Sequence, residues 1–165
     1  GKTHKLSDYA GKIVVLEWFN PDCPIAQRYH DPEARGYDAE HDMTTTFEAL
    51  GDGVVWLAIN SGAPGKQGAG LERNQEAIES YEIPYPVLLD ESGDVGRAYV
   101  AETTPHMYVI TAEGVLAYAG AIDSGSSRAT GDENHVIAAV AAVREGRPCD
   151  PSLTAPFGCS VKYAR

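Results

Sequence analysis

The chain has 165 residues, of which 43% are hydrophobic and 22% are charged, and its formal net charge is −11. This composition is typical of a globular protein. The excess of acidic residues argues against nucleic acids and anionic membranes as partners, because their phosphates would be repelled. No apolar run reaches the roughly 18 residues of a membrane-spanning helix, so no membrane insertion is expected. Without repeats or a linker, residues 1–165 are predicted to form a single domain.

Short apolar runs rich in β-branched residues predict buried strands. Strands are expected at Ile13–Phe19, Val54–Asn60, Tyr85–Asp90, His106–Thr111 and Val115–Ala121. Apolar residues at helical spacing predict helices between them. Helices are expected at Leu71–Glu82, Asp94–Val100 and Asp132–Glu145. The segment from Cys23 to Leu50 is expected to be helical at both ends, with a kink or an insertion at Asp31-Pro32 and Gly36. The alternation predicts a three-layer α/β domain with Ile13–Phe19 as its central strand.

Two connections, the last helix and the C-terminal tail carry further sequence signals. Ala112-Glu113-Gly114 is a turn that predicts an antiparallel hairpin. The small, polar residues 123–131 predict a mobile surface loop. The last helix is expected to hold its acidic residues in the first turn, where the helix dipole favours them. Residues 146–165 then form a C-terminal tail that carries two of the three cysteines.

The cysteines are Cys23, Cys149 and Cys159. They are too few for a disulfide scaffold, and their spacing matches no zinc finger. The count allows one disulfide and a spare thiol, or one reactive thiol and a partner. A purely structural role is the alternative for each of them.

Cys23 follows the predicted central strand and precedes a predicted helix. Pro24 suits the first position of that helix, because its missing N–H would have had no partner there. A thiol at a helix N-terminus has a pKa below the value of about 8.5 for a free cysteine, since the free N–H groups favour the thiolate. The neighbouring Asp22 and the scarcity of cations apart from Arg28 oppose this effect. We interpret Cys23 as a reactive thiol, with a buried inert cysteine as the alternative.

The segment GKIVVLEWFNPDCP resembles the active-site segment of thioredoxin-like proteins, and the run from Tyr85 to Ala121 resembles the second half of that fold. The branch it most resembles is the redoxin group, which holds the AhpC/TSA (alkyl hydroperoxide reductase and thiol-specific antioxidant) proteins and related disulfide oxidoreductases. The likeness covers nearly the whole chain. It implies a thioredoxin-like fold with a mixed central sheet flanked by helices. GKTHKLSDYAGK is similar to the end of that group's N-terminal hairpin, which would be truncated here.

The resemblance implies roles for specific residues. Cys23 matches the attacking cysteine, and Glu17 matches the buried acid that accepts its proton. Alternation along the strand places Glu17 among apolar neighbours, where a carboxyl pKa would be raised, with a solvated or edge glutamate as the alternative. Thr104-Pro105 matches the cis-proline turn that faces the thiol and leaves the Thr104 backbone free to pair with a bound peptide or disulfide.

This chain also departs from its relatives. Ala26 stands where thioredoxins have the second cysteine of Cys-x-x-Cys. Leu16 and Asn20 stand where peroxiredoxins have the Pro and Thr of Pro-x-x-x-Thr-x-x-Cys. Asn20 could still donate a hydrogen bond to a peroxide oxygen, and Asn20 and Pro24 complete the expected substrate site. Arg97 and Arg128 are both candidates for the arginine that peroxiredoxins place over the thiolate.

An oxidised Cys23 needs a resolving thiol. Cys159 is the favoured partner, because a flexible tail can reach a helix N-terminus and loop closure is entropically modest once the ends are near. A pairing of Cys149 with Cys159, which would leave Cys23 alone, is the alternative.

Two other sequence features do not complete a ligand site. SGAPGKQGAG fails as a phosphate loop because its spacing is wrong and Gln67 replaces the Ser or Thr. His30, His41 and His106 could suggest copper, as in thioredoxin-like copper chaperones, but Gln27 and Thr103 occupy the expected ligand positions. No metal and no cofactor is therefore expected.

The expected function is a thiol-dependent oxidoreductase that reduces peroxides or exchanges disulfides, regenerated by a thiol reductant such as a thioredoxin-type protein. A non-catalytic thioredoxin-like binding module and a metal chaperone are the alternatives. Proteins with this likeness are often bacterial and exported, so an exported or periplasmic location is favoured over a cytoplasmic one. Gly1 is not an initiator methionine, so a targeting signal could have been removed with the segment that precedes it.

Overall fold

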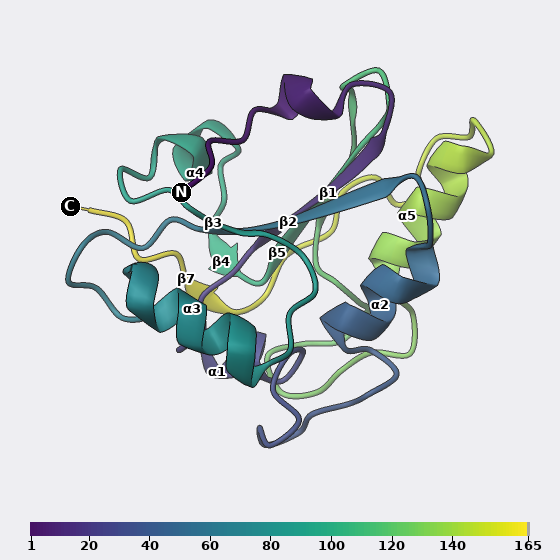
Figure 1. Ribbon diagram of the computed structural model, residues 1–165. Coiled ribbons are helices and arrows are strands. Elements are labelled where there is room, and N and C mark those ends of the chain that lie inside the picture. The colour runs from purple at the N-terminus through teal and green to yellow at the C-terminus, as the bar shows by residue number, and fades with distance from the viewer. Residues whose placement is uncertain (165) are drawn as a thin grey trace.

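The computed structural model describes residues 1–164. Its centre is a five-stranded mixed sheet with the strand order β3-β2-β1-β5-β6 (Figure 1). The strands are β1 (Ile13–Trp18), β2 (Val54–Asn60), β3 (Val87–Leu89), β5 (His106–Ile110) and β6 (Leu116–Gly120). β1 and β3 run parallel to β2, whereas β5 runs antiparallel to both β1 and β6. The central position predicted for the first strand is therefore confirmed.

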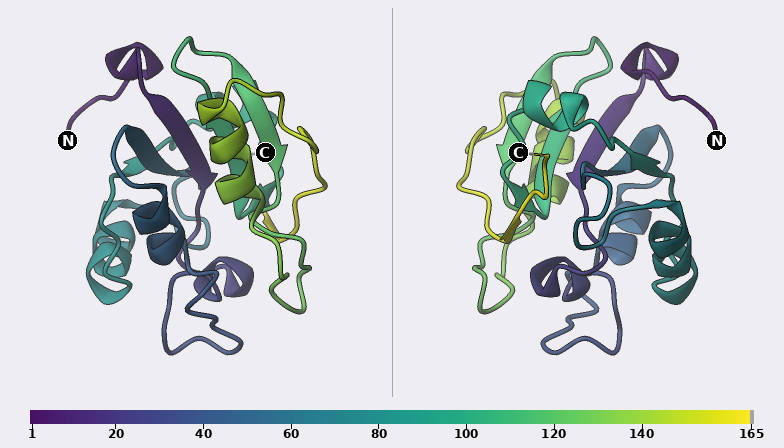
Figure 2. Two further views of the ribbon diagram at one scale, coloured as in Figure 1. Left: turned by 90° about the vertical axis from the view of Figure 1, so that its right-hand side faces the viewer. Right: turned by 90° about the vertical axis from the view of Figure 1, so that its left-hand side faces the viewer.

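Helices lie on both faces of this sheet (Figure 2). They are the 3-10 helix η1 (Leu6–Tyr9) and the α-helices α1 (Pro24–Gln27), α2 (Met43–Leu50), α3 (Leu71–Ser80), α4 (Asp94–Ala98) and α5 (His135–Arg144). The three-layer α/β prediction is thus correct. None of these helices, all within residues 1–164, is long and apolar enough to cross a membrane.

Two apolar clusters follow from the alternation of side chains along β1. Val15 and Phe19 point into one cluster, which α2, α3 and α5 cover. Leu16 and Trp18 point into the other, which is covered by η1, the residues after α4 and the tail. A central strand buried on both faces explains why the sequence of β1 reads as a nearly continuous apolar run.

The segment from Cys23 to Leu50 contains an insertion, which was one of the two predicted alternatives, and not a kinked helix. α1 is a single turn that ends at Gln27, and α2 begins only at Met43. The connection between them contains Pro32, which has no N–H to donate to a helix. α2 starts where the Asp42 side chain accepts a hydrogen bond from the Thr45 N–H at 3.0 Å. The two helical ends are therefore confirmed, and the connection between them is the insertion and not the kink.

The smaller elements agree with the sequence in part. The β5–β6 hairpin is present, with Gly114 at φ +82° in its turn. α5 begins at His135 with Asn134 as its N-cap, so Asp132 and Glu133 precede the helix instead of filling its first turn. Residues 1–12, assigned by the resemblance to the end of a hairpin, contain η1.

The tail, expected to be flexible, contributes a strand. β7 (Cys159–Ser160) pairs antiparallel with β4 (Thr103–Thr104) in a separate two-stranded sheet. Figure 1 shows β7 beside β4 at the end of the central sheet where α1 lies. The C-terminal tail therefore returns to the region of Cys23.

Candidate active site

Cys23 lies directly after β1 and caps the single turn of α1. Its backbone N–H donates to the Asn20 carbonyl oxygen at 3.1 Å, and Pro24 occupies the first helical position as predicted. The Cys23 side chain has no exposed surface. Because α1 has only four residues, the groups that act on the thiol are individual neighbours more than the dipole of a long helix.

Cys23 contacts the Thr104-Pro105 turn, which the resemblance to thioredoxin-like proteins implies should face the thiol. The Thr104-Pro105 peptide bond is cis, as the resemblance implies. Cys23 Sγ donates to the Thr104 carbonyl oxygen at 3.0 Å. Thr104 pairs with Cys159 in the β4–β7 sheet. The fold therefore gathers Cys23, the cis-proline turn and Cys159 in one place.

Opposite pKa shifts distinguish the two cysteines. Burial, the largest influence, disfavours the Cys23 thiolate, but hydrogen bonds from the side chains of Cys159 and Thr104 and from the Ala26 backbone outweigh it and lower the pKa of Cys23. Burial, followed by the hydrogen bond and charge of Cys23, raises the pKa of Cys159 to about 11. Cys23 is therefore the thiol that ionises first, and Cys159 stays protonated beside it.

Cys149 takes no part in this cluster. Its Sγ donates to the Ala139 carbonyl oxygen of α5 at 3.6 Å, and the side chain packs against the larger apolar cluster. Burial raises the pKa of this thiol. The described contacts of Cys149 are thus those of a structural cysteine.

Glu17 is buried among hydrogen-bonding side chains. Its Oε1 lies 2.6 Å from His30 Nε2, and its Oε2 accepts from Trp56 Nε1 at 3.0 Å and Tyr85 Oη at 3.3 Å. Burial, followed by the charges of Glu17 and Asp42, raises the pKa of Tyr85 well above its ordinary value. The carboxylate is therefore held inside the protein by three partners, which rules out the solvated or edge alternative.

Asn20 organises the turn that leads to Cys23. Its Oδ1 accepts from the Asp22 N–H at 2.9 Å, and its Nδ2 donates to the Gln67 carbonyl at 3.1 Å. Gly68 fits against this side chain because a Cβ there would collide with it. Both polar groups of Asn20 are thus engaged in holding the turn, and its predicted contact with substrate stays a prediction.

Neither candidate arginine lies at the thiol. Arg97 stacks on the Tyr163 ring at 4.8 Å and donates to the Ser92 and Ala164 carbonyls. Arg128 is exposed. Among the hydrogen bonds described for residues 1–164, neither guanidinium contacts Cys23 or Thr104.

Two other arginines flank Cys23, and sequence reasoning missed what they do. Arg73 Nε donates to Asp22 Oδ1 at 2.8 Å, which balances the charge expected to oppose a thiolate. Arg28 is buried, and it donates to the Ser126 and Ser127 carbonyls. The Arg28 contacts fasten part of the 123–131 loop to the end of α1. The sequence identified Arg28 only as a cation near Cys23. Nothing in the residues around Arg73 indicated that it would pair with Asp22.

The histidines considered for copper are engaged elsewhere. His30 pairs with Glu17, His41 pairs with Asp38 at 3.1 Å, and His106 Nδ1 lies 3.1 Å from Tyr108 Oη. Burial lowers the pKa of His106 to about 4, so this side chain is neutral near pH 7. Within residues 1–164, no group of three or more His, Cys, Asp or Glu side chains is arranged to hold a metal ion.

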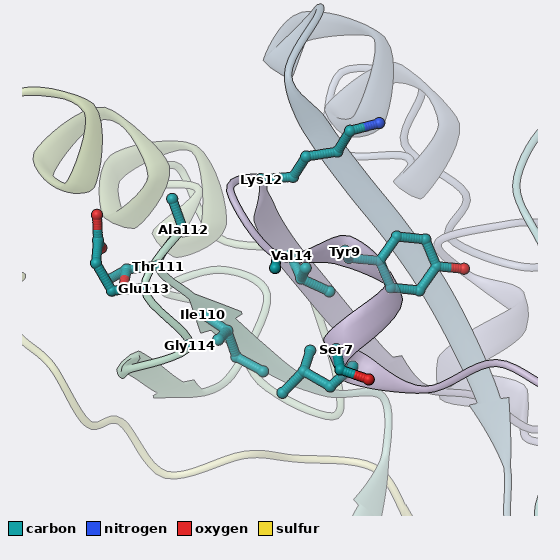
Figure 3. A pocket seen from close by; sticks show the side chains of 11 residues that line it. Ser7, Tyr9, Lys12, Val14, Ile110, Thr111, Ala112, Glu113 and Gly114 are labelled. Carbon is teal, nitrogen blue, oxygen red and sulfur yellow. The ribbon is translucent and has the colours of Figure 1, made fainter.

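A surface pocket lies at the opposite end of β1 from Cys23. Figure 3 shows side chains from residues 7–14 and 110–114 around this cavity of about 250 Å³. Its walls come from η1, the start of β1 and the β5–β6 turn. The pocket is lined by no cysteine or histidine, so none of the candidate redox side chains lies in it.

Comparisons with known proteins identify the family and the fold of the chain. Residues 1–119 match the sequence profile of the AhpC/TSA family. None of the curated proteins searched matches the chain. A hypothetical protein from Sinorhizobium meliloti superposes with a TM-score of 0.80 at 23% identity, covering 99% of this chain and 87% of that one. An uncharacterized conserved protein from Geobacillus kaustophilus superposes with a TM-score of 0.76 at 25% identity, covering 99% of this chain and 84% of that one.

More distant similarities carry a functional description. A secreted disulfide oxidoreductase from Mycobacterium tuberculosis superposes with a TM-score of 0.59 at 19% identity, covering 86% of this chain and 90% of that one. Other matching structures are described as thioredoxin-like. These matches confirm the thioredoxin-like fold. Together with the family match, they support a thiol oxidoreductase in general.

Proposed function

Because the chain belongs to the AhpC/TSA family, we propose that it is a thiol-dependent oxidoreductase in which Cys23 is the nucleophile and Cys159 is the resolving thiol. One observation carries this proposal. β7 pairs Cys159 with Thr104, whose carbonyl oxygen accepts a hydrogen bond from Cys23 Sγ, so a thiol of lowered pKa and one of raised pKa share a site. A nucleophile and a protonated partner are what a two-cysteine cycle requires.

With a hydroperoxide as substrate, the Cys23 thiolate attacks one peroxide oxygen. The O–O bond breaks, an alcohol or water leaves after taking up a proton, and Cys23 becomes a sulfenic acid. The Cys159 sulfur then attacks the Cys23 sulfur, its proton leaves with the hydroxyl as water, and a Cys23–Cys159 disulfide forms. An external thiol reductant, such as a thioredoxin-type protein, returns two electrons and two protons to the pair.

With a disulfide as substrate, the same two residues act in the same order. The Cys23 thiolate attacks one sulfur and releases the other half of the substrate as a thiol, which leaves a mixed disulfide on Cys23. Cys159 then displaces the remaining half and closes the Cys23–Cys159 disulfide. The tail is well placed for either substrate because its strand already holds Cys159 beside Thr104.

Other residues have supporting roles in this proposal. The Thr104-Pro105 turn supports the substrate next to Cys23, Pro24 starts the helical turn, and Asn20 fixes the connection from β1. Glu17 moves a proton to or from the cysteine pair through the buried network that holds it. These assignments rest on the positions and contacts of the residues in the structure.

A second candidate function is a binding module without turnover. It is favoured by the complete burial of Cys23, which denies the sulfur to solvent while the tail is in place. The two functions differ in whether Cys23 is oxidised in a cycle. A binding module needs no sulfenic acid and no disulfide between the tail and Cys23.

The experiment treats reduced protein with one equivalent of hydrogen peroxide, traps sulfenic acid, and maps adducts and disulfides by mass spectrometry. We expect a Cys23 sulfenic acid in the Cys159→Ser variant and a Cys23–Cys159 disulfide in the parent. Cys149→Ser is the matched control and should behave like the parent, since its thiol lies against α5. An insulin-reduction assay in parallel separates the two substrate classes. If Cys23→Ser retains the parent's activity in both assays, or the parent has none, the proposed function is wrong.

A further inference from the structure

The tail occupies the backbone edge that lies next to Cys23. Thr104 pairs with Cys159 and Thr103 pairs with Ser160 in antiparallel register, and the Val161 N–H donates to the Glu102 carbonyl at 3.0 Å. An exposed strand edge recruits any extended segment that can satisfy its hydrogen bonds. The tail therefore holds the place that an external cysteine-bearing peptide would need in order to reach Cys23 by strand pairing.

Tyr163 anchors the far end of this strand. Its hydroxyl donates to the Ala101 carbonyl at 2.8 Å, and the Arg97 guanidinium lies 4.8 Å from the ring centre. Gly93 and Gly96 make room for the ring, because a Cβ at either position would collide with Tyr163. The Lys162 carbonyl also accepts from the Ala63 N–H at 2.9 Å. These contacts form a specific seat for one aromatic side chain.

Gly158 allows the other end of the strand to approach. Its φ is +154°, and a Cβ there would collide with the Thr104 carbonyl. That carbonyl is the acceptor for Cys23 Sγ. The tail backbone thus comes as close to the cis-proline turn as a glycine permits, and Cys159 follows directly.

We propose that residues 158–164 act as a resident, substrate-like strand that keeps peptide disulfides away from Cys23, and that Tyr163 is the positioning residue that latches it. This proposal rests on the proposed function, because it assigns the specificity of the same site. A small substrate needs only a local opening of the tail, whereas an extended peptide must displace the whole two-residue pairing together with the latch. The latch also keeps Cys159 in register with Thr104 for resolution.

The test measures how fast iodoacetamide labels Cys23 in the reduced protein, with each cysteine followed by peptide mapping. Tyr163→Ala should raise the Cys23 labelling rate about tenfold or more at saturating pH, since several contacts that close the tail are lost. Tyr163→Phe keeps the ring over the glycines and loses one hydrogen bond, so an increase of about fivefold is expected. This graded rescue by the conservative variant points to a latch.

Glycine variants supply an independent route to the same result. Gly158→Ala should expose Cys23 without removing any side chain of the site. Gly146→Ala is the matched control, because Gly146 also has a positive φ of +66° and a Cβ there meets nothing within 4 Å. Its Cys23 labelling rate should equal that of the parent. Circular dichroism checks that each variant is folded, and either Tyr163→Ala or Gly158→Ala is sufficient if the other does not fold.

A further readout separates a latch from a general structural role. The rate of reduction of a peptide disulfide should rise more than that of 2-hydroxyethyl disulfide. Unchanged labelling in both Tyr163→Ala and Gly158→Ala would overturn this proposal while leaving the proposed function intact. Failure of the parent to form a Cys23–Cys159 disulfide would instead remove the proposed function, since labelling does not depend on turnover.

Discussion

At Cys23, hydrogen bonding and burial compete for the protonation state of one sulfur atom. Burial alone would keep the thiol neutral, and three donating neighbours reverse that preference. The strongest of these donors is the side chain of Cys159, whose own pKa is raised in exchange. Cys23 and Cys159 therefore shift each other's pKa in opposite directions.

This mutual tuning gives a prediction for position 159. Cys159→Ala removes the donor and should raise the pKa of Cys23, whereas Cys159→Ser keeps a donating hydroxyl and should raise it less. Thiolate absorbance against pH, corrected with Cys23→Ser, measures both. Equal Cys23 titrations in the parent and Cys159→Ala would contradict the assigned hydrogen bond.

The same shift links pH to the stability of the reduced protein. The pKa of Cys23 is lower in the folded chain than the value of about 8.5 for a free cysteine, so ionisation favours the folded state. Its contribution is complete above about pH 9 and is lost as the pH falls through the folded-state pKa. The free energy of unfolding of the parent should therefore rise with pH over this range relative to that of Cys23→Ser, which lacks the thiol.

At the scale of the element, β1 carries a carboxylate into the apolar interior. Glu17 accepts hydrogen bonds from the Trp56 and Tyr85 side chains, and it pairs with His30, which follows the turn of α1. The other ring nitrogen of His30, Nδ1, is buried without a hydrogen-bond partner among the described residues. Glu17 thus ties β1, β2 and the connection after α1 together, whatever part it plays in proton transfer.

Two substitutions at Glu17 separate structure from chemistry. Glu17→Ala leaves buried donors unsatisfied and should lower the free energy of unfolding by about 3 kcal/mol or more. Glu17→Gln keeps the volume and an acceptor oxygen, so the protein should stay folded while turnover slows if the carboxylate moves a proton. Chemical denaturation and steady-state rates measure the two effects. A Glu17→Gln variant with the parent's rate and pH profile would exclude the proton-transfer role.

At the scale of the whole molecule, the tail brings the C-terminal part of the chain back to Cys23. Cys23 follows the first strand, and Cys159 lies six residues before the end of the sequence. The native state holds them near each other without a covalent bond. A disulfide between them therefore constrains mainly the unfolded chain, where the same residues would be far apart.

We expect the oxidised protein to be markedly more stable than the reduced protein. For a loop of this length, the chain-entropy estimate is on the order of 5 kcal/mol. Denaturant unfolding of both redox states measures the difference. Cys159→Ser should show no such redox dependence, and Cys149→Ser should show the full effect. A parent whose stability is unaffected by oxidation would mean that the tail disulfide does not form.

Local sequence patterns determined much of this protein. Short apolar runs predicted the five strands of the central sheet, and for β1 burial on both faces requires such a composition. The order of strand, Cys23 and Pro24 predicted the start of α1, because proline fits a first helical position. The likeness to redoxins added Thr104-Pro105, and the place of Cys159 in the tail made it the favoured partner of Cys23. Each of these signals depends on adjacent residues or on motif order.

Only the tertiary structure decided which distant groups meet. It joined Glu17 to His30, Asp22 to Arg73 and Cys159 to Thr104, and it seated Tyr163 against two glycines of the α4 region. Such contacts depend on strand register and on the packing of segments far apart in the chain, which no local pattern encodes. The tail that the sequence described as flexible is held for the same reason, because its partners lie some sixty residues earlier.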